Sequence, residues 1–109
     1  MIKLVTLLVR RDGLTHQEFV DYWMTEHAPR ASEMPNVRKY VTDVPTDPQK
    51  SEYDGVAELY FDDVSELKEA FESPTGQAVE ADLQNFAKPD AGPTLIVEED
   101  VQLDETESQ

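Results

Sequence analysis

The sequence predicts an α+β domain in which four antiparallel strands form one sheet, with helices on one of its faces. Apolar stretches with strand character alternate with segments of helical periodicity, in the order βαββαβ. The chain has 109 residues, enough for one hydrophobic core and no second domain. It contains no cysteine, which excludes disulfide frameworks, thiolate metal sites and thiol nucleophiles. The order of elements is that of a ferredoxin-like split βαβ domain.

The first strand and the first helix follow from the N-terminal third of the sequence. A nearly continuous apolar run predicts a strand over residues 2–10, and both of its faces are apolar, which implies cover on both sides. A helix is predicted to begin at Thr15, because Thr15 and Glu18 have the spacing of a capping box. Pro29 lacks an amide hydrogen and restricts the residue before it, so we expect this helix to kink or end around residues 27–30.

Turn residues and helix caps predict the remaining elements. The second helical segment is capped at residues 62–63 and interrupted at Ser73, which caps a further helix with Pro74 at its first position. The domain is expected to span residues 1–103, and the acidic tail 104–109 is expected to fray. Further strands are predicted over residues 37–44, 53–61 and 94–103.

The charge balance excludes several partners. Nine Lys and Arg stand against 24 Asp and Glu, a formal charge of −15, so no basic face exists for nucleic acid or an anionic membrane. The acid is spread over every segment, and high salt would screen the resulting self-repulsion. We therefore expect the acidic surface of a halophilic protein, with an ordinary acidic protein as the alternative. No apolar run approaches the roughly 18 residues of a membrane span, and no signal-peptide pattern is present, which predicts a cytoplasmic protein.

One face of the predicted sheet lacks cover. The helices occupy one face, yet the first strand is apolar on both, and the chain has no further element to place there. An open apolar sheet promotes aggregation, so a second copy of the chain is the simplest cover. We expect a homodimer formed through the open sheet face, which would close an eight-stranded α+β barrel around a central cavity.

His27 is the strongest catalytic candidate. An imidazole exchanges protons near neutral pH, and at a helix end beside Glu26 its protonated form should be favoured. The alternative is a structural histidine that caps helical carbonyls or is hydrogen-bonded in the core. No metal site is expected, because His16 lies about 16 Å away along the helix and no His-Glu-x-x-His motif is present.

Aromatic side chains supply candidates for substrate binding. Trp23 lies one helical turn before His27, where it either walls a pocket beside the imidazole or fills the core. Tyr40 and Tyr60 could donate hydrogen bonds to an oxygen-bearing ligand, although buried tyrosines need such partners for structural reasons too.

Alternation along the third predicted strand assigns two acidic candidates. Its small and apolar residues suit the helix-covered face, so Asp54, Glu58 and Tyr60 are expected to point toward the barrel interior or its rim. Glu58 could equally be a solvated edge carboxylate. The sequence has no glycine-rich phosphate loop and no nucleophile elbow, so no nucleotide cofactor is expected.

Several motifs between residue 2 and about residue 99 are more specific than any single residue. They are Ile2-Lys3-Leu4-Val5, Arg10-Arg11-x-Gly13-Leu14, Glu18-Phe19-x-x-Tyr22-Trp23-x-x-x-His27-Ala28-Pro29, Tyr53-Asp54-Gly55-Val56-Ala57-Glu58-Leu59-Tyr60-Phe61 and Phe71-x-Ser73-Pro74-x-Gly76. Together they closely resemble the EthD-like family of the dimeric α+β barrel superfamily. The resemblance implies the barrel dimer and favours a functional His27. Tyr60 stands where the family often carries tryptophan.

The resemblance does not select a reaction. Its superfamily includes lactone isomerases, polyketide cyclases or dehydratases, cofactor-independent monooxygenases and haem-handling enzymes. Our first hypothesis is a cofactor-free enzyme of isomerase or lyase type, in which His27 acts as general acid/base on a cyclic or aromatic oxygenated metabolite. Trp23 and Tyr60 would wall the pocket, and Asp54 and Tyr40 would orient a carbonyl or hydroxyl. The alternatives are a non-catalytic module that sequesters a small hydrophobic metabolite, and a cofactor-independent monooxygenase.

Overall fold

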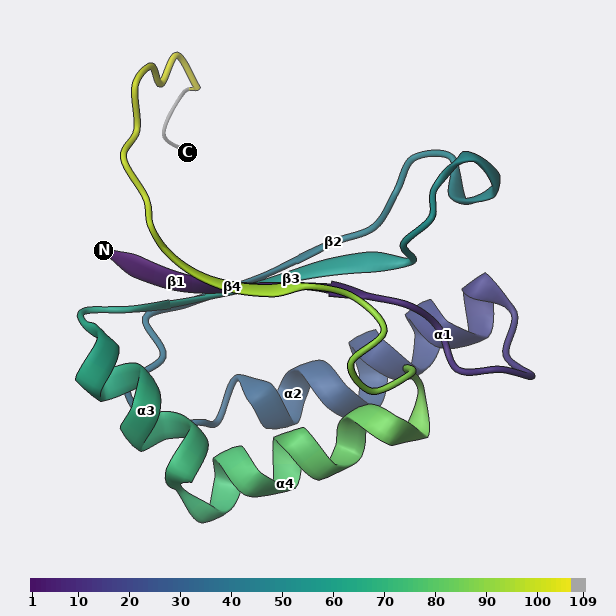
Figure 1. Cartoon of the computed structure of the whole chain (residues 1–109), viewed down its shortest axis with the longest axis horizontal. Coiled ribbons are helices and arrows are strands. Elements are labelled where there is room, and N and C mark those ends of the chain that lie inside the picture. The colour runs from purple at the N-terminus through teal and green to yellow at the C-terminus, as the bar shows by residue number, and fades with distance from the viewer. Residues whose placement is uncertain (107–109) are drawn as a thin grey trace.

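The computed structural model describes residues 1–106 and has the predicted βαββαβ order (Figure 1). Its strands form one antiparallel sheet in the order β2-β3-β1-β4, and α1 to α4 lie on one face, so the fold is ferredoxin-like. The acidic tail predicted over residues 104–109 lies outside the described residues from position 107 on. The strands are β1 (Ile2–Leu8), β2 (Lys39–Asp43), β3 (Gly55–Phe61) and β4 (Thr94–Glu98).

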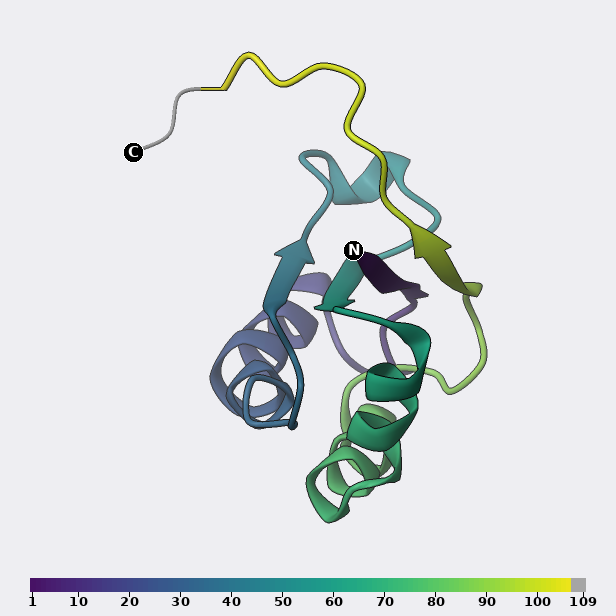
Figure 2. The same cartoon turned by 90° about the vertical axis from the view of Figure 1, so that its left-hand side faces the viewer.

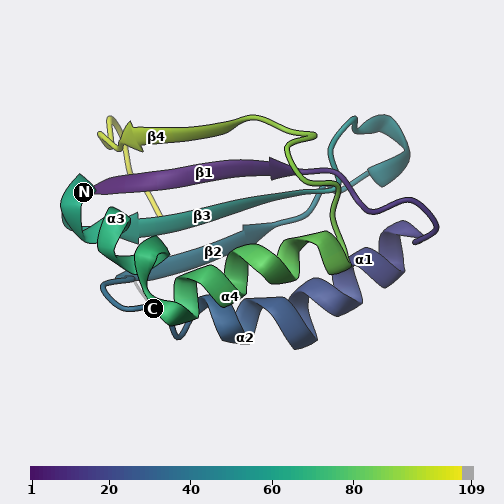
Figure 3. The same cartoon turned by 60° about the horizontal axis from the view of Figure 1, so that its bottom comes forward.

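The helices form two rods that lie side by side beneath the sheet (Figure 3). The first rod consists of α1 (His16–Tyr22), a π-helical turn (Trp23–His27) and α2 (Ala28–Ala31). The second part of the chain contributes α3 (Val64–Glu72), α4 (Pro74–Asp82) and a short 3₁₀ turn (Leu83–Asn85), and another 3₁₀ turn (Pro48–Lys50) lies between β2 and β3.

The predicted helix caps are confirmed. Thr15 accepts a hydrogen bond from the Glu18 amide at 3.1 Å, and the Glu18 carboxylate accepts one from the Thr15 amide at 2.9 Å, which completes the capping box. Asp63 caps α3, and Ser73 caps α4 ahead of Pro74. These caps satisfy amides that have no partner within the helix.

The interruption predicted around residues 27–30 is a π-helical turn and not a helix end at His27. The rod continues to Ala31, and it accommodates Pro29 through the π-helical turn, in which the Ala28 amide bonds to the Trp23 carbonyl. In a regular α-helix the proline ring would collide with the carbonyl of Thr25, four residues before it. One wider turn moves that carbonyl aside. His27 therefore lies inside the rod and not at its end.

The strands are shorter than predicted because their pairing ends earlier. β1 pairs with β3 only as far as Leu8 opposite Gly55. β4 lies at the sheet edge and ends at Glu98, which pairs with Ile2 at the start of β1. The predicted extension to residue 103 has no strand beside it. β2 covers only the part of residues 37–44 that faces β3.

The core lies between the sheet and the helices, in two clusters. The alternation predicted for β3 is confirmed, since Ala57, Leu59 and Phe61 are buried on the helix-covered face. Gly55 is needed at its position because the Trp23 ring lies directly against it. A Cβ atom there would lie 2.9 Å from Cη2 of Trp23 and closer still to a neighbouring ring carbon.

The opposite face of the sheet is open in the single chain, as predicted, but it is not uniformly apolar (Figure 2). Val5 and Val56 lie on it, together with a polar group centred on Lys3, Glu58 and Tyr60. Within the described residues, no helix is long and apolar enough to cross a membrane.

Candidate functional site

A cavity of about 160 Å³ lies between the sheet and the two helical rods. It lies within one chain, on the helix-covered side of the sheet, and not on the open face where a barrel interior was expected. The cavity wall is mostly apolar, with His27 and Tyr40 among its polar members. Its lining includes Leu4, Leu8, Trp23, His27, Tyr40, Leu59, Leu83 and the segment 88–92.

His27 is held in this wall by a buried carboxylate. Its Nδ1 lies 2.8 Å from Oδ2 of Asp82, and the two residues are only 4% and 2% exposed. The Phe86 ring packs on the imidazole with a centroid separation of 4.7 Å. The imidazole is thereby fixed from two sides, on a helical turn whose π geometry is common at functional sites.

The protonation state of His27 differs from the expectation drawn from the sequence. Burial lowers the pKa of His27 below its usual 6.5, and this effect outweighs the opposite effect of the nearby Asp82 carboxylate. His27 is therefore neutral near pH 7. The predicted preference for the protonated form is wrong, because burial of the imidazole disfavours its charged form.

The tautomer of His27 follows from the state of Asp82. Burial acts to raise the pKa of Asp82, but hydrogen bonds from Asn85, Tyr22 and His27 outweigh it and lower that pKa. An ionised carboxylate only accepts hydrogen bonds, so Nδ1 of His27 carries the proton. Nε2 then carries a lone pair, and no hydrogen bond engages it among residues 1–106.

Asp82 is the residue of this candidate site that the sequence analysis missed. It accepts hydrogen bonds from four side chains, three on the first helical rod and one on the 3₁₀ turn after α4. Oδ2 binds His27, and Oδ1 binds the other three. The sequence signal was available: Asp82 interrupts the apolar stripe of Val79, Leu83 and Phe86, where an aspartate has no reason to be buried unless it is paired. The partners and distances are His27 at 2.8 Å, Tyr22 at 2.7 Å, Arg30 at 3.0 Å and Asn85 at 3.0 Å.

Tyr40 brings a second polar group to the cavity wall. Its hydroxyl accepts a hydrogen bond from Nε1 of Trp23 at 3.0 Å, and burial raises the pKa of Tyr40, so the phenol stays protonated. Because Trp23 is the donor in that bond, the phenolic proton is available to a ligand. Trp23 is fully buried and also lines the cavity, so it combines both roles considered for it.

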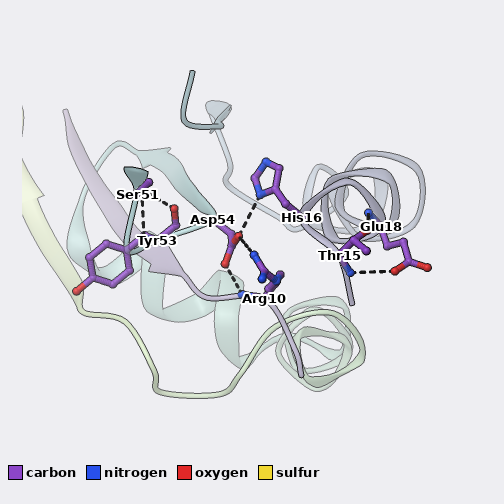
Figure 4. A network of polar contacts seen from close by, with 7 residues as sticks. All are labelled: Arg10, Thr15, His16, Glu18, Ser51, Tyr53 and Asp54. Atoms are coloured by element: carbon purple, nitrogen blue, oxygen red, sulfur yellow. Dashed lines mark hydrogen bonds and ion pairs between the residues drawn. The ribbon is translucent and has the colours of Figure 1, made fainter. Parts of the chain in front are cut away.

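Asp54 does not belong to this cavity. It turns out of the sheet just before β3 and binds the Arg10 amide at 2.8 Å, the Arg10 guanidinium at 3.1 Å and Nδ1 of His16 at 3.0 Å (Figure 4). Burial acts to raise the pKa of Asp54, and these bonds outweigh it and lower that pKa. Asp54 therefore joins the end of β1 to the start of α1.

Glu58 and Tyr60 lie on the open face of the sheet, as predicted, but the sheet separates them from His27. Lys3 bonds to Glu58 at 2.7 Å and to Glu99 at 2.9 Å, and the Tyr60 hydroxyl donates to Glu99 at 2.7 Å. The hydrogen bonds from Lys3 lower the pKa of Glu58. Tyr60 and Trp23 thus cannot wall one pocket within a single chain.

The fold and the histidine site define a ferredoxin-like α+β protein with a cavity beneath its sheet, and comparison with known proteins identifies its family. The model of the EthD domain matches residues 11–90, so the chain belongs to the EthD family. An uncharacterized 11.0 kDa protein from the thcB-thcC intergenic region of Rhodococcus erythropolis is 32% identical over 81 residues, which cover 72% of this chain and 76% of that protein.

Solved structures support the same assignment. An EthD family protein of Bacillus halodurans has a TM-score of 0.78 and 27% identity, over 91% of this chain and 98% of that one. A dimeric ferredoxin-like protein of unknown function from Thermobifida fusca has a TM-score of 0.71 and 14% identity, over 88% of each chain. SnoaB, a cofactor-independent oxygenase of Streptomyces nogalater, has a TM-score of 0.69 and 12% identity, over 94% and 95%. The last two likenesses show the fold alone.

Residues that could hold a metal do not gather in the described part of the chain. No group of three or more histidine and carboxylate side chains at metal-binding spacing occurs among residues 1–106. His16 and His27 belong to separate networks, each bound to its own aspartate.

Proposed function

We propose that the protein is a cofactor-free enzyme that relocates a proton on a cyclic or aromatic oxygenated small molecule, by isomerisation, cyclisation or dehydration. The observation that carries this proposal is a neutral histidine, His27, oriented by the buried carboxylate of Asp82 in the wall of an apolar cavity. A titratable group with a perturbed pKa and a charged partner, lining a cavity, is a common feature of catalytic sites.

His27 acts as general base through Nε2. A C–H or O–H of the substrate gives its proton to the Nε2 lone pair, and the ionised Asp82, 2.8 Å from Nδ1, stabilises the imidazolium that forms. The same proton then returns to a different atom of the substrate, so the protein ends the cycle unchanged. Proton transfer of this kind contributes about 10²- to 10⁴-fold to a rate.

Tyr40 stabilises the charge that develops on the substrate. When a proton leaves a carbon next to a carbonyl, negative charge moves to the carbonyl oxygen. The Tyr40 hydroxyl lines the same cavity and keeps a proton to donate to that oxygen. Asp54 and Tyr60, which the sequence had associated with this pocket, take no part in the proposed mechanism.

The cavity favours a small neutral ring compound. Its volume of about 160 Å³ is close to the roughly 150 Å³ of an apolar cavity that holds benzene, so a compound with one ring fits. The charged residues that line it are all exposed to solvent, which leaves the buried part uncharged and unsuited to an ionic substrate. These charged residues are Glu80, Lys88 and Asp90.

A base-sensitive probe tests the proposal without knowledge of the natural substrate. 5-Nitrobenzisoxazole loses a ring C–H proton to a base, its N–O bond breaks, and a coloured nitrophenolate forms. We expect the protein to accelerate this ring opening over buffer, and His27→Gln to remove the acceleration. The rate should fall as the pH drops through the pKa of His27, below 6.5. His16→Gln is the matched control, because His16 lies outside the cavity lining.

The probe also separates the enzyme from the sequestering module. Binding can be followed by the NMR signals of the His27 ring. A probe that shifts these signals but opens no faster than in buffer would favour a module that stores a small hydrophobic molecule. Equal rates for the wild type and His27→Gln would remove His27 from the chemistry.

A further inference from the structure

The segment that follows β4 projects away from the rest of the chain. Residues 99–106 rise from the sheet on the side opposite the helices (Figures 1 and 2). Val101 and Leu103 are 61% and 75% exposed, although both are large and apolar. Exposed apolar side chains on a segment beside an uncovered sheet face indicate a surface that binds another molecule.

The base of this segment is fixed by hydrogen bonds. The Glu99 carboxylate accepts from Lys3 at 2.9 Å and from the Tyr60 hydroxyl at 2.7 Å, and the Glu99 amide donates to the Met1 carbonyl at 3.2 Å. Hydrogen bonds from Tyr60 and Lys3 lower the pKa of Glu99, which keeps this anchor ionised. The segment therefore leaves the sheet from a defined point and toward the open side.

The open face by itself is small for a stable interface. Four strands about 4.8 Å apart and five to seven residues long give a flat footprint of about 400 Å². Each partner in an interface of standard size buries about 800 Å². The seven residues 100–106 reach about 24 Å when extended, more than the roughly 10 Å between packed sheets, so they can extend the contact onto the partner.

The charge of the open face fits a second copy of this chain. Lys3 and Lys39 stand on it against the carboxylates of Asp43, Glu58 and Glu99, so the face is nearly neutral in a chain of charge −15. Under two-fold symmetry, lysines of one copy can approach carboxylates of the other. The rest of the surface is strongly anionic and repels a like-charged chain.

We propose that residues 100–106 form an arm that binds a second copy of this chain over the open face, with Val101 and Leu103 buried against that copy.

Sedimentation equilibrium of the full chain, of a chain ending at Glu99, and of V101S/L103S tests the arm. The shorter chain loses four carboxylates, so electrostatic repulsion alone predicts tighter self-association. The arm predicts the opposite, a dissociation constant raised about tenfold or more in both variants, because burial of the two side chains is lost. Val64→Ser is the control, since Val64 is 41% exposed but lies on α3, away from the open face. Circular dichroism verifies that each variant is folded.

Each outcome decides the proposal. A weakened dimer in both variants, with Val64→Ser unchanged, supports the arm. A dissociation constant that is unchanged or lower in the chain ending at Glu99 overturns it, and so does a full-length chain that stays monomeric at every concentration. None of these outcomes depends on the chemistry proposed for His27.

Discussion

Replacement of Asp82 by asparagine is expected to destabilise the protein and to reverse the tautomer of His27. The amide oxygen can still accept from Tyr22 and Asn85, but the amide nitrogen then faces Nδ1 of His27, and two donors cannot bond. Nδ1 must become the acceptor, so the proton moves to Nε2 and the lone pair that serves as the base is lost.

The size of the stability loss follows from the hydrogen bonds whose acceptor changes from a carboxylate to a neutral amide. A hydrogen bond to an ion contributes about 1.5–3 kcal/mol and a neutral one about 0.5–1.5 kcal/mol, so each of the three bonds from His27, Tyr22 and Asn85 weakens by about 1 kcal/mol. The bond from Arg30 adds little, because the Arg30 side chain is 52% exposed. The expected loss is about 3 kcal/mol of unfolding free energy, which lowers the Tm by about 12–24 °C in a domain of this size.

Urea unfolding followed by the fluorescence of Trp23, the only tryptophan, measures the loss, and nitrogen NMR of the imidazole reports the tautomer. Asp21→Asn is the matched control. Asp21 is an exposed aspartate on α1 that bonds to Gln17 at 2.8 Å, and its replacement should change stability by less than about 0.5 kcal/mol. If Asp82→Asn changed stability no more than the control and left Nδ1 protonated, the buried ion pair would have no part in holding His27.

Three further results are expected. Because the native pKa of His27 lies below 6.5, the unfolded chain binds a proton at His27 before the folded chain does as the pH falls. The neutral histidine therefore makes its full contribution to the unfolding free energy above pH 6.5, and this contribution decreases below it. Urea unfolding of His27→Gln at several pH values should lack this part of the pH dependence. Gly55→Ala should cost about 1–3 kcal/mol, because its methyl group would overlap Trp23, and a chemical denaturation midpoint equal to the wild type would contradict that packing. The Tm measured by circular dichroism should rise by several degrees from about 0.01 M to 1 M NaCl, because salt screens the charge of −15; a maximum at low salt would speak against a halophilic protein.

The sequence by itself determined the local features of this protein. Hydrophobic alternation predicted which residues of β3 face the helices, and the capping residues Thr15, Asp63 and Ser73 marked where three helices begin. These signals lie within a few residues of each other, so no knowledge of the tertiary fold is needed to interpret them. The open face of the sheet followed from the order of the elements alone.

Only the tertiary structure decided which side chains work together. His27 and Asp82 are 55 residues apart, and they meet because α4 packs beside the first helical rod, a docking that periodicity does not encode. The sequence did not show whether the helix would continue past Pro29. In the folded chain it does, through the π-helical turn. The sequence did not show that the cavity lies on the helix-covered side of the sheet, whereas Tyr60 lies on the open side. Local patterns follow from the chain's own geometry, whereas a site depends on contacts between segments that are distant in sequence.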